Sequence, residues 1–208
     1  TVRISNLYVK QGANSNVLLN GMTLTNGTTR NGVHVTLAGE GAELDLCGMV
    51  IADKNQHVDN HTVIDHAVPR CNSRELFKYV LDDEATGAFS GLVLVRPDAQ
   101  HTNSQQTNRN LCATRQARMY TQPQLEIYAD DVKCSHGATV GQLDERALFY
   151  MRQRGIPEKE ARLLLMFAFV NEVIDTIRLD ALRDRLHLLV EKRFRGELNK
   201  CKGCAICN

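Results

Sequence analysis

The chain has 208 residues, of which 43% are hydrophobic and 24% charged, and its formal net charge is +1. This is the composition of a globular protein that buries a sizeable core, as one domain or as one domain with an appendage. A net charge so near zero gives no attraction to nucleic acid or to an anionic membrane. The longest apolar run, Leu163 to Val170, is far shorter than the roughly 20 residues that span a membrane.

The cysteines and the start of the chain indicate its setting. The seven cysteines are an odd number and the sequence shows no secretory signal, so we expect reduced thiols in a cytoplasmic protein. Strand-like sequence begins at once after Thr1, without an initiating methionine, and we interpret the chain as a fragment.

Residues 1–142 consist of short apolar or alternating runs, with turn signals such as Asn20-Gly21 and no helical period. Two all-β architectures fit, a sandwich or barrel and a solenoid of stacked coils. Many runs have only two to five residues, and the polar stretch Gln100–Asn110 suits ladders of Asn, Gln and Thr between coils, so the pattern slightly favours the solenoid. The runs include Val33–Leu37, Leu44–Leu46, Gly48–Ala52, Val63–His66, Phe77–Leu81, Leu92–Val95 and Leu125–Tyr128.

The stretch from Asp131 to Glu145 marks the change from strands to helices and holds two candidate metal ligands. In a strand, residues two apart lie on the same face, so Cys134 and His136 should point the same way. A thiolate and an imidazole both bind iron, but two ligands are too few to hold a metal or a cluster. We therefore predict half of a site on the last, unpaired strand edge, which another chain or a distant segment completes.

From Leu143 the apolar residues recur with a helical period, so residues 143–198 are predicted to form a small helical domain. Gly155 and Pro157 end the first helix, and one helix broken once, or two helices, follow. The following helix is apolar almost all round from Leu163 to Val170, which predicts that a partner protein docks on it. The residues predicted to make this contact are Leu164, Phe167, Val170 and Ile174.

Residues 199–208 form a cysteine-rich tail, NKCKGCAICN. Cys201, Cys204 and Cys207 have the CxxCxxC spacing of bacterial ferredoxin loops, which add a fourth cysteine followed by proline. Two interpretations stay open: an auxiliary metal or cluster site that another subunit completes, and a reduced tail without a metal role.

The three histidines His57, His61 and His66 lie near Asp59 and Asp65 in the sequence. Only one pair at a time shares a strand or helix face, so we expect hydrogen-bonded surface histidines and not a metal site.

Three contiguous motifs resemble one known family. They are QTNRNL (Gln106–Leu111), PQLEIYADDVKC (Pro123–Cys134) and DVKCSHGATVGQLDERALFYMRQRGI (Asp131–Ile156). All three resemble the SufB/SufD family of iron–sulfur cluster assembly scaffold proteins, and the resemblance runs over most of residues 34–198. The chain is closer to the SufD branch, because Cys-Ser-His-Gly-Ala-Thr stands where SufB-type chains carry Glu-His-Glu-Ala-Thr.

The resemblance implies a fold and two partners. The fold is a right-handed parallel β-helix followed by a small C-terminal α-helical region, which decides between the two β architectures. SufB and SufD pair through the ends of their β-helices, which implies a SufB-facing edge at Asp131, Val132 and Lys133 and places His136 at the joint interface. The helical region implies binding of SufC, an ABC-type ATPase, over roughly residues 144–190. Cys71 and Cys112 are expected inside the solenoid as small packed thiols.

The function that the resemblance implies is that of a non-catalytic scaffold, which shares a transient iron–sulfur cluster with its partner at Cys134 and His136. The chain contains neither GxxxxGK[ST] nor GxGxxG, and no catalytic triad stands out, so we expect no bound nucleotide and no enzymatic activity. A homodimer of the isolated chain stays open. So do two other functional classes, a carbohydrate-active β-helix enzyme and a purely structural interaction module.

Overall fold

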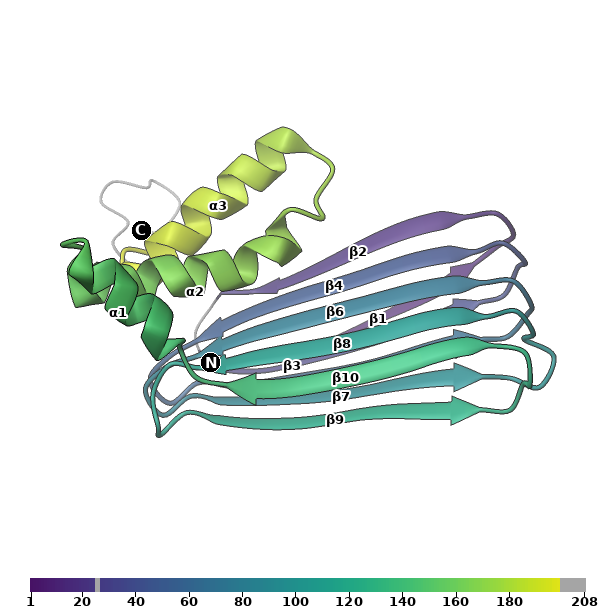
Figure 1. Cartoon of the computed structure of the whole chain (residues 1–208). Coiled ribbons are helices and arrows are strands. Elements are labelled where there is room, and N and C mark those ends of the chain that lie inside the picture. The colour runs from purple at the N-terminus through teal and green to yellow at the C-terminus, as the bar shows by residue number, and fades with distance from the viewer. Residues whose placement is uncertain (25–26, 199–208) are drawn as a thin grey trace, which may run out of the picture. The chain divides into compact units, whose positions relative to one another are not determined.

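Figure 1 shows the computed structural model of the chain, which describes residues 1–24 and 27–198. The chain divides into two compact units, Thr1–Gln142 and the residues from Leu143 onward. In the described part, the first unit contains the strands and the second contains the helices.

The first unit is built from two parallel sheets of five strands each (Figure 1). One has the order β1-β3-β5-β7-β9 and the other the order β2-β4-β6-β8-β10, so consecutive strands alternate between the sheets. β3, β5, β7 and β9 begin at residues 28, 57, 86 and 118, so these coils take 29 to 32 residues. The strands are β1 (Val2–Gln11), β2 (Asn16–Thr23), β3 (Thr28–Leu37), β4 (Glu43–Ala52), β5 (His57–His66), β6 (Asn72–Leu81), β7 (Thr86–Val95), β8 (Asn103–Cys112), β9 (Arg118–Ile127) and β10 (Lys133–Gly141).

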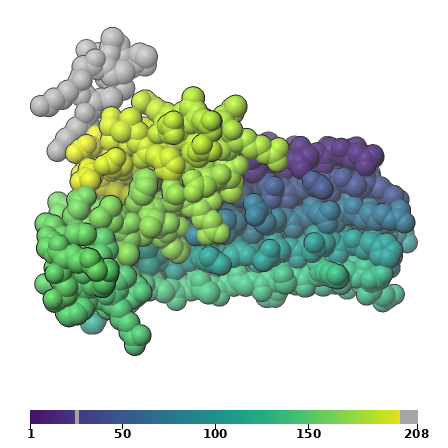
Figure 2. Space-filling view, turned by 45° about the horizontal axis from the view of Figure 1, so that its top comes forward, coloured from purple at the N-terminus to yellow at the C-terminus, as the bar shows by residue number. Residues whose placement is uncertain are grey.

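This topology confirms the predicted parallel solenoid, with about five coils that each give one strand to each sheet. Figure 2 shows the strands following one another in chain order, with colours from purple to green. The strands are longer than the apolar runs suggested: β3 starts at Thr28, well before the run Val33–Leu37. The strands extend beyond these apolar runs because polar residues fill the first half of several strands.

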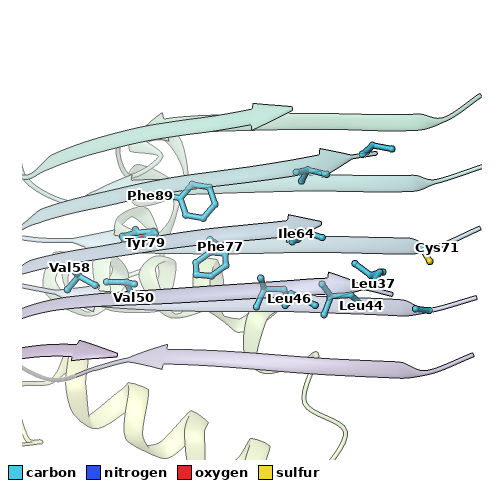
Figure 3. Packing of buried hydrophobic residues seen from close by; sticks show 14 of the residues in the cluster. Leu37, Leu44, Leu46, Val50, Val58, Ile64, Cys71, Phe77, Tyr79 and Phe89 are labelled. Atoms are coloured by element: carbon cyan, nitrogen blue, oxygen red, sulfur yellow. The ribbon is translucent and has the colours of Figure 1, made fainter. Parts of the chain in front are cut away.

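The core lies between the two sheets, because alternate side chains of every strand point inward. Figure 3 shows Phe77, Tyr79 and Phe89 in this interior, and the rings of Phe77 and Phe89 lie 5.0 Å apart. Gly48 leaves room for Phe77, since a Cβ at this position would lie 2.1 Å from the phenyl ring. The aromatic layer therefore depends on a glycine in the neighbouring strand.

We expect Phe77→Ala to lower the free energy of unfolding by about 3–5 kcal/mol, the usual cost of removing a buried phenylalanine ring. The measurement is urea unfolding followed by circular dichroism. The matched control is Tyr120→Ala, since Tyr120 is 61% exposed and should cost less than about 1 kcal/mol. Equal losses in the two variants would contradict this description of the core.

Polar side chains also stack from coil to coil inside the solenoid, as the predicted ladders require. The hydroxyl oxygens of Ser73 and Ser104 lie 2.8 Å apart, and Asn31 Nδ2 donates to Asn60 Oδ1 at 2.9 Å. The polar stretch Gln100–Asn110 lies mainly in β8, where alternate side chains are buried. Polar residues form a strand here because each finds its partner in an adjacent coil.

One of these buried side chains, Glu75 on β6, makes stability depend on pH. Burial raises its pKa from 4.5 to about 7, while the nearby Thr62 hydroxyl and the hydrogen bond from Gln106 oppose the rise. Between these two values the folded chain holds a proton that the unfolded chain has lost, so stability falls as the pH rises through this window. Across this window the unchanged chain should lose stability on the order of 3 kcal/mol. Glu75→Gln, which cannot ionise, should not show this loss. Urea unfolding at about pH 4 and 8 measures it, and an unchanged pH dependence in the variant would refute it.

The second unit contains α1 (Glu145–Gln153), α2 (Glu158–Ile174) and α3 (Asp180–Phe194). Asp144 caps α1 by accepting hydrogen bonds from the backbone N–H groups of Arg146 and Ala147. The open question after Pro157 is answered by two helices, α2 and α3. Within the described residues, no helix has the length and apolar character needed to cross a membrane.

Candidate functional site

The candidate site lies on β10, the last strand of its sheet. β10 pairs with β8, and no other described strand pairs with it in the sheet. An edge strand of this kind presents unpaired backbone N–H and C=O groups that another chain can bind. We call Asp131–Gly141 the β10 edge. It contains the predicted contact residues Asp131, Val132 and Lys133, of which Asp131 and Lys133 are exposed.

A short network fixes the turn that leads into β10. The backbone N–H of Asp131 donates to Gln100 Oε1 at 2.9 Å, and the Asp131 carboxylate lies 2.9 Å from His101 Nδ1. The backbone N–H of His101 in turn donates to the Asp131 carbonyl at 2.6 Å. The start of the β10 edge is therefore tied to the previous coil.

Cys134 and His136 lie on the inward face of β10. They pair in register with Ser104 and Gln106 of β8, whose side chains are buried in the solenoid. This confirms that the two residues share a face. Cys134 is half-buried and packs against the core, whereas His136 is exposed to solvent. The structure thus places one sulfur and one imidazole at an open end of the interior.

Burial raises the pKa of the Cys134 thiol, and a backbone hydrogen bond at Ser104 partly opposes this. The thiol is therefore protonated at neutral pH and needs a metal or another positive group to become a thiolate. Among the described residues, no group of three or more His, Cys, Asp or Glu side chains could hold a metal ion. The β10 edge offers two candidate ligands, so a metal bound there would need further ligands from elsewhere.

In the described part of the chain, His57, His61 and His66 belong to no group of three or more side chains that could hold a metal ion. His57 is exposed and His61 is half-buried. His66 was expected at the surface, but this was wrong: it is fully buried and lies 2.9 Å from Ser73 Oγ through Nε2. Burial lowers its pKa to about 4, with Asp65 opposing. His66 is therefore a neutral part of the polar interior.

The cysteines divide into buried, half-buried and undescribed residues. Cys71 and Cys112 are buried, as predicted, and burial raises the pKa of both thiols. The three tail residues Cys201, Cys204 and Cys207 lie outside the described residues.

The residues predicted to dock a partner on α2 fall into two groups. Val170 and Ile174 are fully buried, so they shape the helical unit itself. Leu164 is 43% exposed, and with Phe167 it lines a groove of about 250 Å³ between α2 and α3. The other lining residues are Glu160, Leu163, Glu191, Phe194 and Arg195.

Charged side chains close one part of this groove. Arg195 binds both carboxylate oxygens of Glu160 on α2, at 3.2 and 2.9 Å, and it also donates to Glu191 on α3 at 3.0 Å. These contacts join the two helices, so the groove has an apolar floor and a fixed charged border.

Comparison with known proteins identifies the family. The family described as "SUF system FeS cluster assembly, SufBD core domain" matches residues 1–169. The chain belongs to the SufBD family. It is 38% identical over 179 residues to the iron–sulfur cluster assembly protein SufD of Escherichia coli, covering 86% of this chain and 41% of that protein. The SufBD family chain therefore spans about two fifths of this relative's length.

Two further relatives are also similar over most of this chain and over about two fifths of their own length. An iron–sulfur cluster assembly SufBD family protein of Synechocystis is 38% identical, over 91% of this chain and 42% of the relative. The chloroplastic protein ABCI7 of Arabidopsis thaliana is 36% identical, over 86% of this chain and 38% of the relative.

Sequence reasoning did not connect the site to the buried polar residues behind it. Glu75 and Gln106 precede His136 in one row of the sheet, since Glu75 pairs with Gln106 and Gln106 with His136. The spacing of about one coil between these positions was the available signal, but it becomes visible only when the coil length is known.

Proposed function

We propose that the chain is a SufD-type scaffold subunit of a complex that assembles iron–sulfur clusters. The observation that supports this most directly is the exposed His136 beside Cys134 on an unpaired strand edge. The cluster is the cargo of the complex, held for a time between this chain and its partner. The chain supplies a sulfur and an imidazole, and it performs no catalysis of its own.

The partner at the β10 edge is a SufB-like chain, which supplies the missing ligands. Pairing of two strand edges continues the sheet across the interface, and the inward-facing side chains of both last coils then meet. Asp131, Val132 and Lys133 form the start of this contact. A second copy of the chain is the competing partner when SufB is missing.

The second partner is a SufC-like ABC ATPase that docks on the groove between α2 and α3. Leu164 and Phe167 provide the apolar contact, and Glu160 and Arg195 border it. ATP binding draws two SufC subunits together, and the seam between the scaffold subunits opens to iron and sulfur. The cytoplasm, or another compartment that keeps thiols reduced, suits this chemistry.

The direct test is co-expression of the chain with SufB-like and SufC-like subunits, followed by purification through a tag on this chain. We expect all three proteins to purify together and to carry an iron–sulfur cluster after anaerobic isolation. Purification of the chain without either partner would argue for an isolated structural module.

A further inference from the structure

Glu75, Gln106 and His136 occupy three successive positions in one row of side chains. They come from β6, β8 and β10, which are neighbours in the sheet, and the strand register pairs each with the next. Neighbouring strands lie about 4.8 Å apart, so side chains in such a row are within reach of one another. The row leads from the buried interior to the exposed imidazole.

The amide of Gln106 is held in one orientation. Its Nε2 donates to Glu75 Oε2 at 2.6 Å, and above about pH 7, where Glu75 is ionised, this carboxylate can only accept a hydrogen bond. Gly91 on the opposite sheet gives the amide its space, since a Cβ there would lie 2.5 Å from Nε2. The amide oxygen therefore faces away from Glu75.

That oxygen, Gln106 Oε1, is buried and has no hydrogen-bond partner among the described residues. A buried acceptor without a partner is unfavourable, so a donor at this place is expected. The next side chain in the row is His136, whose neutral ring has one N–H donor and one nitrogen with a free lone pair.

We propose that Gln106, fixed by Glu75, accepts a hydrogen bond from His136 and so directs the other ring nitrogen toward ligands at the β10 edge. This rests on the proposed function, in which His136 is a ligand. Gln106 and Glu75 are then positioning residues, comparable to the outer-shell groups that orient histidine ligands in metal sites. They select one tautomer of the ring before any metal arrives.

The test is the tautomer ratio of His136, measured from the ring ¹⁵N chemical shifts of the full 208-residue chain at about pH 8.5, about two pH units above the ordinary pKa of a free histidine side chain. Glu75, with its pKa of about 7, is ionised there too. The signal of His136 is the one that His136→Ala removes. We expect the ratio to change about five-fold in Gln106→Leu, as loss of a hydrogen bond of about 1 kcal/mol gives.

The matched control is Gln105→Leu, which changes the exposed neighbour on the outer face of the same strand and should leave the ratio unchanged. Glu75→Gln is the second variant. Its new amide can donate to Gln106 Oε1, so the amide orientation is released and the preference for one tautomer should be lost. An unchanged ratio in Gln106→Leu would overturn the proposal. Should that variant not fold, an unchanged ratio in Glu75→Gln would do the same.

The outcome separates this proposal from the proposed function. We expect Gln106→Leu to lower the yield of assembled cluster at least about tenfold while partner binding stays intact. If the tautomer ratio changes in Gln106→Leu but the cluster yield of His136→Ala is normal, the ligand role is refuted and the hydrogen bond stands. If the tautomer ratio is unchanged in Gln106→Leu but His136→Ala loses the cluster, only the positioning role of Gln106 is refuted.

Discussion

Replacing His136 by alanine should reduce cluster assembly by more than about tenfold while the chain still binds both partners. The imidazole is exposed on the β10 edge, where it can meet a second protein, and in the proposed function it supplies a ligand together with Cys134. Loss of a ligand should lower the cluster yield at least as much as loss of an outer-shell group, which typically lowers metal affinity or activity 10–100-fold. Because the side chain is exposed, the free energy of unfolding should change by little more than the about 1 kcal/mol of its proposed hydrogen bond to Gln106.

The measurement is the iron and sulfide content and the visible absorbance of the purified complex, compared between His136→Ala and the unchanged chain. His57→Ala is the matched control, because His57 is an exposed histidine on the other sheet and lies away from the β10 edge. Normal cluster content in His136→Ala would remove the reason for regarding the edge as an assembly site. Loss of partner binding in the same variant would turn His136 into an interface residue.

Placing a charge in the apolar groove of the helical unit should prevent capture of the ATPase. Leu164→Asp puts a carboxylate among the apolar groups of Leu163, Phe167 and Phe194, which lie between α2 and α3. A desolvated charge without a partner is costly at an interface, so we expect affinity for the SufC-like subunit to fall more than about tenfold. The measurement is isothermal titration of the chain with that subunit.

Ala168→Asp provides the control, since Ala168 is exposed on the same helix and does not line the groove. It adds the same charge at a neighbouring place and should leave the affinity within about twofold. If both variants bind normally, the docking surface lies elsewhere. If Leu164→Asp loses helical content, the substitution acts on the helical unit itself, and Glu191→Lys at the groove border becomes the informative variant.

The open edge and the stacked interior belong together physically. Every inner strand of the solenoid has a neighbour on both sides, and the last strand of each sheet does not. Its backbone groups and inward side chains are available to another protein. In this way, a repeating fold can present candidate ligands at its end without a dedicated loop.

Several features followed from local sequence patterns. The shared face of Cys134 and His136 follows from the two-residue period of a strand, which depends on neither partner nor register. The break between α1 and α2 follows from the local backbone preferences of Gly155 and Pro157. The long contiguous motifs around Gln106–Leu111 and Pro123–Ile156 identified the family, since such runs carry information independent of their conformation.

Other features depended on contacts between distant residues. The strand β8 was not recognisable as such, because Ser104, Gln106 and Asn108 become compatible with a buried strand only when neighbouring coils supply their hydrogen bonds. The inward position of His66 depends on the same stacking, as does its contact with Ser73. Likewise, helical spacing identified an apolar face on α2 but could not separate the buried Val170 and Ile174 from the exposed Leu164.

By itself, the sequence determined the change from β-structure to helices, the family, and the pair of candidate ligands on one strand face. The structure confirmed the predicted strand edge, and it alone decided that Glu75 and Gln106 stand behind His136 in one row. The physical reason is that period and turn chemistry are local, whereas coil length and register arise from pairing between residues about 30 positions apart.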